Sequence, residues 1–165
     1  MSMIGEYFRL TPADLERARE DTDWALDHVE EVREAEEGGP SSVPARHFST
    51  YKAWHLLDHL LKRSGFPVDV VHGEEPLEGA DDWGYGPPHY LTAERVRLCS
   101  TALSALTYDR LVDGVDPGEL DAAEIYPLHW EDRAALEWGR GWFTGLTAYF
   151  AAAARDGHAV LVWID

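Results

Sequence analysis

Residues 159–164 read Ala-Val-Leu-Val-Trp-Ile, an uninterrupted apolar run. Its length suits a β-strand, and the absence of alternating polar residues predicts a strand that is buried on both faces. Such a strand is most simply placed in the centre of a sheet, with helices packed against either side. We therefore expect a mixed α/β fold built around this segment.

Two further strands complete the predicted sheet. Ile4, Phe8 and Leu10 occupy one face of an N-terminal strand, and Val68–Val71 is a short apolar run in the middle of the chain. About five to seven helices are expected to cover this small sheet. No linker-like segment divides the sequence, so residues 1–165 are predicted to form one compact domain.

Helical spacing of apolar residues is clearest in two segments. One helix is expected to run to about Arg63, with Ser49 or Thr50 as its N-cap. Its buried stripe would consist of Ala53, Trp54, Leu57, Leu60 and Leu61. A longer helix is predicted over residues 131–155, where apolar residues recur every three or four positions. The helix side that they form is expected to pack in the core. That side consists of Ala135, Trp138, Trp142, Leu146, Tyr149 and Ala153.

The chain is strongly acidic. Its 165 residues include 14 Lys and Arg against 31 Asp and Glu, a formal net charge of −17. Nucleic-acid binding requires basic side chains that replace phosphate counterions, so neither a nucleic acid nor an anionic membrane is an expected partner. Disorder is also excluded, because 45% of the residues are hydrophobic, including 7 Trp and 7 Tyr.

The sequence predicts a cytoplasmic protein. Cys99 is the only cysteine, so no intrachain disulfide can form and a reducing compartment is expected. Glu6 and Arg9 interrupt the N-terminal apolar residues, which argues against a signal peptide. No run approaches the roughly 18–20 apolar residues of a membrane span.

Acidic residues gather on an early predicted helix, residues 23–37. Its exposed face holds Asp27, Glu30, Glu31, Glu34 and Glu36. Such a run is typical of a solvated helix face. The same face would also suit a basic protein partner, because opposite charges speed association. In that interpretation the chain is an acidic inhibitor or immunity-type protein that masks a basic partner such as a nuclease.

One histidine cluster has the spacing of a metal site. His55, Asp58 and His59 lie at positions i, i+3 and i+4 of a predicted helix and share a face. Two histidines four residues apart can ligate zinc, but the glutamate of the HExxH motif is missing. The alternative is that these side chains pair with neighbours at a half-buried boundary. No cofactor is predicted, since Gly139-Arg-Gly-Trp-Phe-Thr-Gly145 misses the dinucleotide-binding spacing and lies within a helix.

Three segments are rich in His, Trp and Tyr and poor in aliphatic residues: 48–55, 84–90 and 126–130. All three flank loops, and aromatic side chains held by Gly and Pro in a loop can form a rigid recognition surface. We expect them to converge in one cleft. Its candidate ligand-binding residues are His47, Trp54, His55, Tyr85, His89 and Tyr126. The alternative is that the loop folds over the core and buries its rings.

Four motifs together resemble the YfbM-like bacterial family. They are Ser-Met-Ile-Gly-Glu-Tyr-Phe-Arg-Leu-Thr at 2–11, Phe-Ser-Thr-Tyr-Lys-Ala-Trp-His-Leu-Leu at 48–57, Gly-Tyr-Gly-Pro-Pro-His-Tyr-Leu-Thr at 84–92 and Ile-Tyr-Pro-Leu-His-Trp at 125–130. The resemblance extends over essentially the whole chain. It implies a mixed α and β domain of a cytosolic bacterial protein, and no reaction, because the function of that family is unknown.

Two classes of function remain open at the level of sequence. The first is a binding protein that takes an unidentified small ligand or a basic protein partner through the His and aromatic cleft. The second is a small-molecule hydrolase or metal-dependent enzyme. There His55 would act as general base, Asp58 would orient it or serve as a ligand, and His59 or His47 would be a further ligand.

Overall fold

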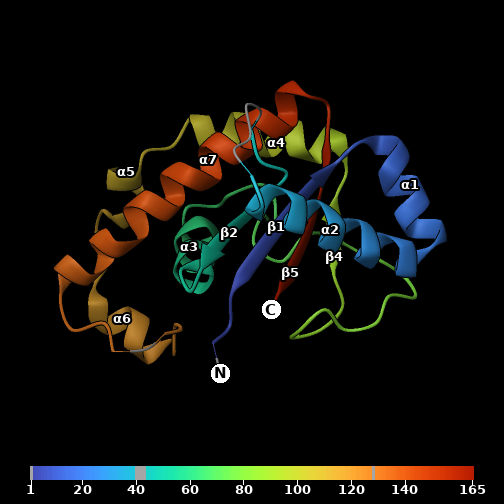
Figure 1. The fold of residues 1–165 in the computed structure, drawn as a ribbon. Coiled ribbons are helices and arrows are strands. Elements are labelled where there is room, and N and C mark those ends of the chain that lie inside the picture. The colour runs from blue at the N-terminus through green and yellow to red at the C-terminus, as the bar shows by residue number, and fades with distance from the viewer. Residues whose placement is uncertain (1, 40–43, 128) are drawn as a thin grey trace.

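A computed structural model describes residues 2–39, 44–127 and 129–165 of the chain (Figure 1). Within these ranges five strands form one antiparallel sheet in the order β2-β1-β5-β4-β3. The strands are β1 (Gly5–Leu10), β2 (His47–Tyr51), β3 (Glu75–Pro76), β4 (His89–Leu91) and β5 (Ala159–Ile164). The apolar run that closes the sequence is thus the central strand, as predicted.

Strand β5 is central because neither of its faces meets water. Its first five residues are at most 5% exposed. Val162 packs with Tyr7 of β1 in the larger core cluster, and Leu161 packs with Phe8 in a smaller cluster on the opposite face. Because side chains alternate along a strand, β1 and β5 divide the molecule into these two cores.

Helices cover both faces of the sheet. On the Phe8 face lie α1 (Pro12–Glu20) and α2 (Thr22–Glu37), in front of the sheet in Figure 1. The hydroxyl of Thr11 caps α1 by accepting a hydrogen bond from the Asp14 backbone N–H at 3.1 Å. The other face is covered by α3 (Trp54–Arg63), α4 (Ala93–Ser104) and α7 (Gly139–Arg155). The short α5 (Tyr108–Val112), α6 (Pro117–Ala122) and 3₁₀ helix η1 (Arg133–Trp138) extend this layer.

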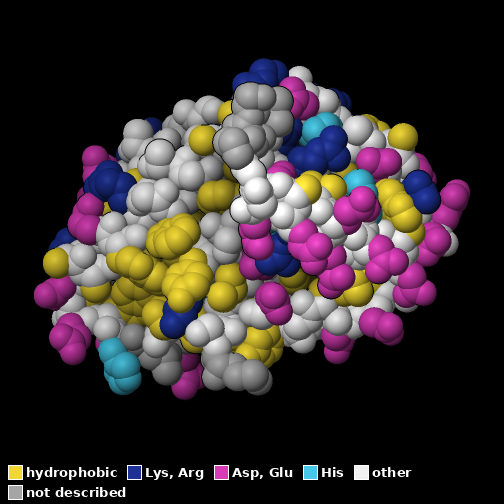
Figure 2. Space-filling view, viewed as in Figure 1, with side chains coloured by type: hydrophobic (Ala, Val, Ile, Leu, Met, Phe, Trp, Pro, Cys, Tyr) yellow, Lys and Arg dark blue, Asp and Glu magenta, His cyan; other side chains and the backbone are white. Residues whose placement is uncertain are grey.

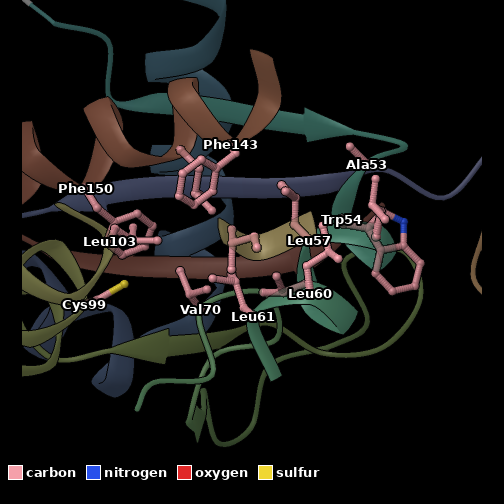
Figure 3. Packing of buried hydrophobic residues seen from close by; sticks show 14 of the residues in the cluster. Ala53, Trp54, Leu57, Leu60, Leu61, Val70, Cys99, Leu103, Phe143 and Phe150 are labelled. Carbon is pink, nitrogen blue, oxygen red and sulfur yellow. The ribbon is translucent and has the colours of Figure 1, made fainter. Parts of the chain in front are cut away.

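The larger core fills the space between α3, α4, α7 and the sheet (Figure 3). Leu57, Leu60 and Leu61 come from α3, as the predicted stripe requires, and meet Leu103 of α4 and Phe143 of α7. The mixed α/β class is therefore confirmed, with seven α-helices in the described ranges. None of these helices is both long and apolar enough to span a membrane.

Two local predictions were wrong. Val68–Val71 is not the middle strand; it forms buried turns whose apolar side chains, including Val70, enter the larger core. The middle of the sequence instead supplies β2, β3 and β4. Ser49 and Thr50 are not helix caps either, because both lie in β2, and α3 begins after Ala53 without a side-chain cap.

The predicted long helix at 131–155 is divided at Gly139. Residues before this point form η1, and α7 follows. A Cβ at residue 139 would contact the Tyr108 hydroxyl and would lie 2.9 Å from Leu56 Cδ2, so glycine allows the elements to approach here. The change of helix type also changes which side faces inward. Trp138 is 39% exposed and is not a core residue, whereas Phe143 is buried.

Candidate functional site

The N-terminal end of α3 carries a stack of aromatic rings. Trp54 is the first residue of the helix and is buried. Its ring stacks on His55, with centroids 4.8 Å apart, and on Tyr126, with centroids 6.0 Å apart. His55 Nδ1 accepts a hydrogen bond from the Tyr126 backbone N–H at 2.9 Å. This bond joins α3 to the loop that follows α6.

The backbone of Met3 fixes the same stack. The Trp54 indole N–H donates to the Met3 carbonyl at 3.1 Å, and the Met3 N–H donates to the Tyr126 hydroxyl at 3.2 Å. Burial lowers the pKa of His55. Nδ1 must be unprotonated to accept the bond from Tyr126. His55 is therefore a neutral hydrogen-bond acceptor in this arrangement.

His72 packs edge-on against Trp54, with ring centroids 5.9 Å apart and an interplanar angle of 79°. Its Nε2 lies 3.6 Å from Oδ2 of Asp58, and the same oxygen accepts a hydrogen bond from Lys62 Nζ at 3.0 Å. The Asp58 carboxylate raises the pKa of His72. Burial acts to raise the pKa of Asp58, but His72 and Lys62 outweigh burial and lower it. The pair therefore favours an imidazolium beside a carboxylate.

His72 also lines a small pocket beside the end of β5. The pocket has a volume of about 120 Å³, and the residues with imidazole or hydroxyl groups that line it are His72, Tyr85 and His89. Strand β4 positions His89, which pairs with Val162 of β5. The remaining lining residues are Val71, Gly86, Pro87, Val162, Trp163 and Ile164.

The loop before β4 holds Tyr85 at this pocket. The Tyr85 backbone N–H donates to the Ile164 carbonyl at 2.8 Å. Gly84 has a φ of +139°, and a Cβ there would lie 2.6 Å from the same carbonyl oxygen, so glycine is required for this approach. The Tyr85 side chain remains 49% exposed. A ligand can therefore reach the pocket from solvent beside this ring.

His72 connects the aromatic stack to the pocket, because it contacts Trp54 and lines the pocket as well. Five of the six candidate residues thus lie in one continuous group: Trp54, His55, Tyr85, His89 and Tyr126. Sequence reasoning missed His72. The available signal was a lone histidine directly after the buried Val68–Val71 segment and before Gly73, whose φ is +78°.

The structure does not bring His47 to this group. His47 pairs with Phe8 in the sheet and therefore lies on the α2 face, opposite Tyr7 and α3. Its Nε2 is 2.5 Å from Oε2 of Glu6, a carboxylate that is 5% exposed. The expectation that His47 would share the cleft was wrong because the strand register points its side chain to the other side of the sheet.

The three residues with metal-site spacing engage separate partners. His59 Nε2 lies 3.1 Å from Glu119 Oε1, Asp58 pairs with Lys62 and His72, and His55 accepts from Tyr126. In residues 2–39, 44–127 and 129–165, no group of three or more His, Cys, Asp or Glu side chains is placed to hold a metal ion.

The fold and the sequence define the class of protein. Residues 1–163 match the family model described as "Domain of unknown function (DUF1877)", so the chain belongs to the DUF1877 family. Among solved structures, it is similar to YfbM from Escherichia coli, a protein of unknown function. The two share 18% identity over 98% of this chain and 99% of YfbM, with a TM-score of 0.70. This likeness shows a common fold, and the predicted resemblance to the YfbM-like family is confirmed. Comparison with curated proteins gives no match.

Proposed function

We propose that the chain is a binding protein that holds a small hydrogen-bond-accepting ligand in the pocket of His72, Tyr85 and His89. The observation that carries this proposal is the position of His72. His72 is paired with Asp58, whose side chain is 12% exposed, and it lines a pocket together with His89 and Tyr85. An imidazole oriented by a carboxylate is a directed donor rather than a freely rotating one.

The groups that line the pocket suggest the ligand chemistry. Among the described residues no carboxylate side chain lines it, whereas His72, Tyr85 and His89 carry hydrogen-bond donors. Nδ1 of His89 lies 3.3 Å from the Pro87 carbonyl. A carboxylate or a neutral carbonyl oxygen is the matching acceptor. A single negative charge is favoured over several, because the chain itself carries −17. The volume of 120 Å³ equals that of about four water molecules, so the pocket suits an acyl group.

Binding is favoured over nucleophilic catalysis at this pocket. In the described part of the chain, no Ser, Thr or Cys side chain lines it. Cys99 lies in the core, and burial raises the pKa of its thiol, which keeps it protonated. His55, the general base of the enzymatic alternative, already accepts a hydrogen bond through Nδ1. We place this binding protein in the cytoplasm, because its one cysteine is buried and unpaired.

A titration followed by NMR tests this function. Acetate and acetamide have nearly the same shape and differ in charge, so together they separate recognition of an anion from recognition of a carbonyl oxygen. We expect at least one of them to cause saturable amide shifts at Tyr85, His89 and Val162. His89→Ala should weaken that binding about tenfold by removing a donor. His129→Ala is the matched control, since His129 is exposed and lies outside the pocket. The absence of saturable shifts with either probe would overturn the proposal.

A further inference from the structure

A second surface, formed by residues outside the His72 pocket, exposes aromatic rings. We define the aromatic surface as Tyr51, Trp138 and Trp142 with the groove residues Pro127, Trp130 and Ala135, of which Trp130 is only 4% exposed. Tyr51 is 44% exposed and stacks on Trp142 with centroids 6.1 Å apart. Trp138 contacts Trp130, also with centroids 6.1 Å apart. Figure 2 shows a broad hydrophobic patch in this region, beside α7 and α3.

The surface includes a preformed groove. Its volume is about 200 Å³, and Pro127, His129, Trp130, Ala135 and Trp138 line it. Grooves bordered by tryptophan are typical of the points at which protein interfaces gain most of their affinity. The helical periodicity of 131–155 would place Trp138 and Trp142 in the core. Instead Trp138 is 39% exposed, and Trp142 is half-buried against the larger core.

The backbone of Tyr51 supports a role beyond folding. Its φ is +51°, in the left-handed region that is unfavourable for a bulky side chain. Glycine would adopt this conformation without strain. The tyrosine is nevertheless present, with its ring on the surface rather than in the core. Strained residues of this kind concentrate at functional sites.

Charge around the surface selects the kind of partner. Glu131 and Asp132, both exposed, follow Trp130 directly, and Asp132 also caps η1 by accepting from the Ala135 N–H. The neighbouring Arg133, also exposed, donates to the Val115 and Val112 carbonyls. Lys52 lies over the Tyr51 ring at 5.5 Å and is not among the residues that line the groove. A second copy of the chain carries the same net charge of −17, so like charge opposes self-association. Charge complementarity therefore favours a basic protein over self-association.

We propose that the aromatic surface docks a protein segment that combines an apolar side chain with Lys or Arg. The apolar side chain enters the groove between Pro127 and Trp138, and the basic groups lie against Glu131 and Asp132. This inference differs from the acidic-helix interpretation, because the groove lies in residues 127–138, before α7, and not on α2. It is independent of ligand binding at the His72 pocket.

Phage-displayed random 12-residue peptides, selected on the intact protein, test the proposal. We expect the selected peptides to carry Lys or Arg near Leu, Phe or Trp, and synthetic copies to bind less tightly in high salt. Trp138→Ala should weaken binding about tenfold or more. Leu98→Ala is the matched control, because Leu98 is 40% exposed on α4, away from this surface. Tyr51→Gly provides a second variant that removes the ring and the strain together.

Charge reversals locate the basic groups of the peptide. Glu131→Lys should weaken binding several-fold, whereas Glu31→Lys on α2 should leave it nearly unchanged. The proposal is overturned if the selected peptides lack basic residues, or if Trp138→Ala and Tyr51→Gly bind as wild type does. A greater loss in Glu31→Lys than in Glu131→Lys would also overturn it and return the contact to α2. A dimer in sedimentation that Trp138→Ala dissolves would identify a second copy as the occupant instead.

Discussion

Nε2 of His72 lies 3.6 Å from Oδ2 of Asp58, whose side chain is 12% exposed. The folded state raises the pKa of His72 and lowers that of Asp58. The contribution of His72 is complete below its unfolded pKa of about 6.5 and is lost as pH rises through the folded value. The contribution of Asp58 is present above about pH 3.9 and is lost as pH falls through its folded pKa.

Asp58→Asn should therefore lower the pKa of His72 and destabilise the protein most between about pH 4 and 6.5. Denaturant unfolding of both proteins at pH 5.5 and pH 8 measures the difference. Lys62 still pairs with Asp58 at pH 8, so the difference should shrink there without vanishing. A difference that grows toward pH 8, or a pKa of His72 that is the same in both proteins, would contradict this pairing.

Acid should destabilise the protein through His158. Arg9 Nη1 lies 3.1 Å from His158 Nδ1, and because arginine only donates, Nδ1 must accept and the ring must be neutral. Burial, followed by Arg9 and Arg46, lowers the pKa of His158. The unfolded chain then binds a proton more readily, so the free energy of unfolding should fall as pH drops through about 6.5. His158→Gln should reduce this slope in unfolding experiments between pH 7.5 and 5.5, and an unaltered slope would exclude His158 as its source.

Tyr7→Phe should stabilise the protein. The Tyr7 hydroxyl is buried without a hydrogen-bond partner among the described residues. A buried unpaired hydroxyl costs about 1–3 kcal/mol, so its removal should raise the melting temperature by a few degrees. Tyr149→Phe is the matched control, because the Tyr149 hydroxyl donates to the Arg46 carbonyl at 2.6 Å. That variant should lose about 1 kcal/mol. Equal losses in both variants would show that the Tyr7 hydroxyl is satisfied.

Two glycines at the start of α7 should respond in opposite directions. Gly139→Ala would introduce a Cβ 2.9 Å from Leu56 Cδ2 and against the Tyr108 hydroxyl, which should destabilise the protein by about 1–3 kcal/mol. A Cβ at Gly141 meets nothing within 4 Å. Gly141→Ala should therefore add up to about 1 kcal/mol through helix propensity. Thermal unfolding of the two variants measures these changes in stability. A Gly139→Ala variant as stable as wild type would refute the close packing between η1 and α7 at Gly139.

The central strand was predictable because an apolar run of strand length has few alternatives to a buried β5. Strand β2 was not predictable from the sequence, because Ser49 and Thr50, which follow Phe48, also suit a helix cap. In addition, β2 pairs with β1, which is distant in the sequence. The exposure of Trp138 could not be predicted from the sequence, for a different reason. A period of three to four assumes one continuous α-helix, and η1 breaks that continuity at Gly139.

The candidate site was predictable in composition and not in geometry. The grouping of Trp54, His55 and Tyr126 follows from aromatic side chains near loops, which the sequence displays. The part that His72 plays in the site could not be predicted, because Asp58 of α3 comes close to His72 only in the folded chain. The face on which His47 lies is set by the register of β2 against β1. A register shift of one residue would have placed its side chain on the other face of the sheet.

Binding in the pocket of His72, Tyr85 and His89 is tested most directly by NMR titration of the histidine ring nitrogens with and without acetate at matched ionic strength. A carboxylate bound between His72 and His89 should raise the pKa of both imidazoles, because it favours their protonated forms. The exposed His129 should be unaffected. Unchanged pKa values for His72 and His89, or an equal rise at His129, would contradict carboxylate binding in this pocket.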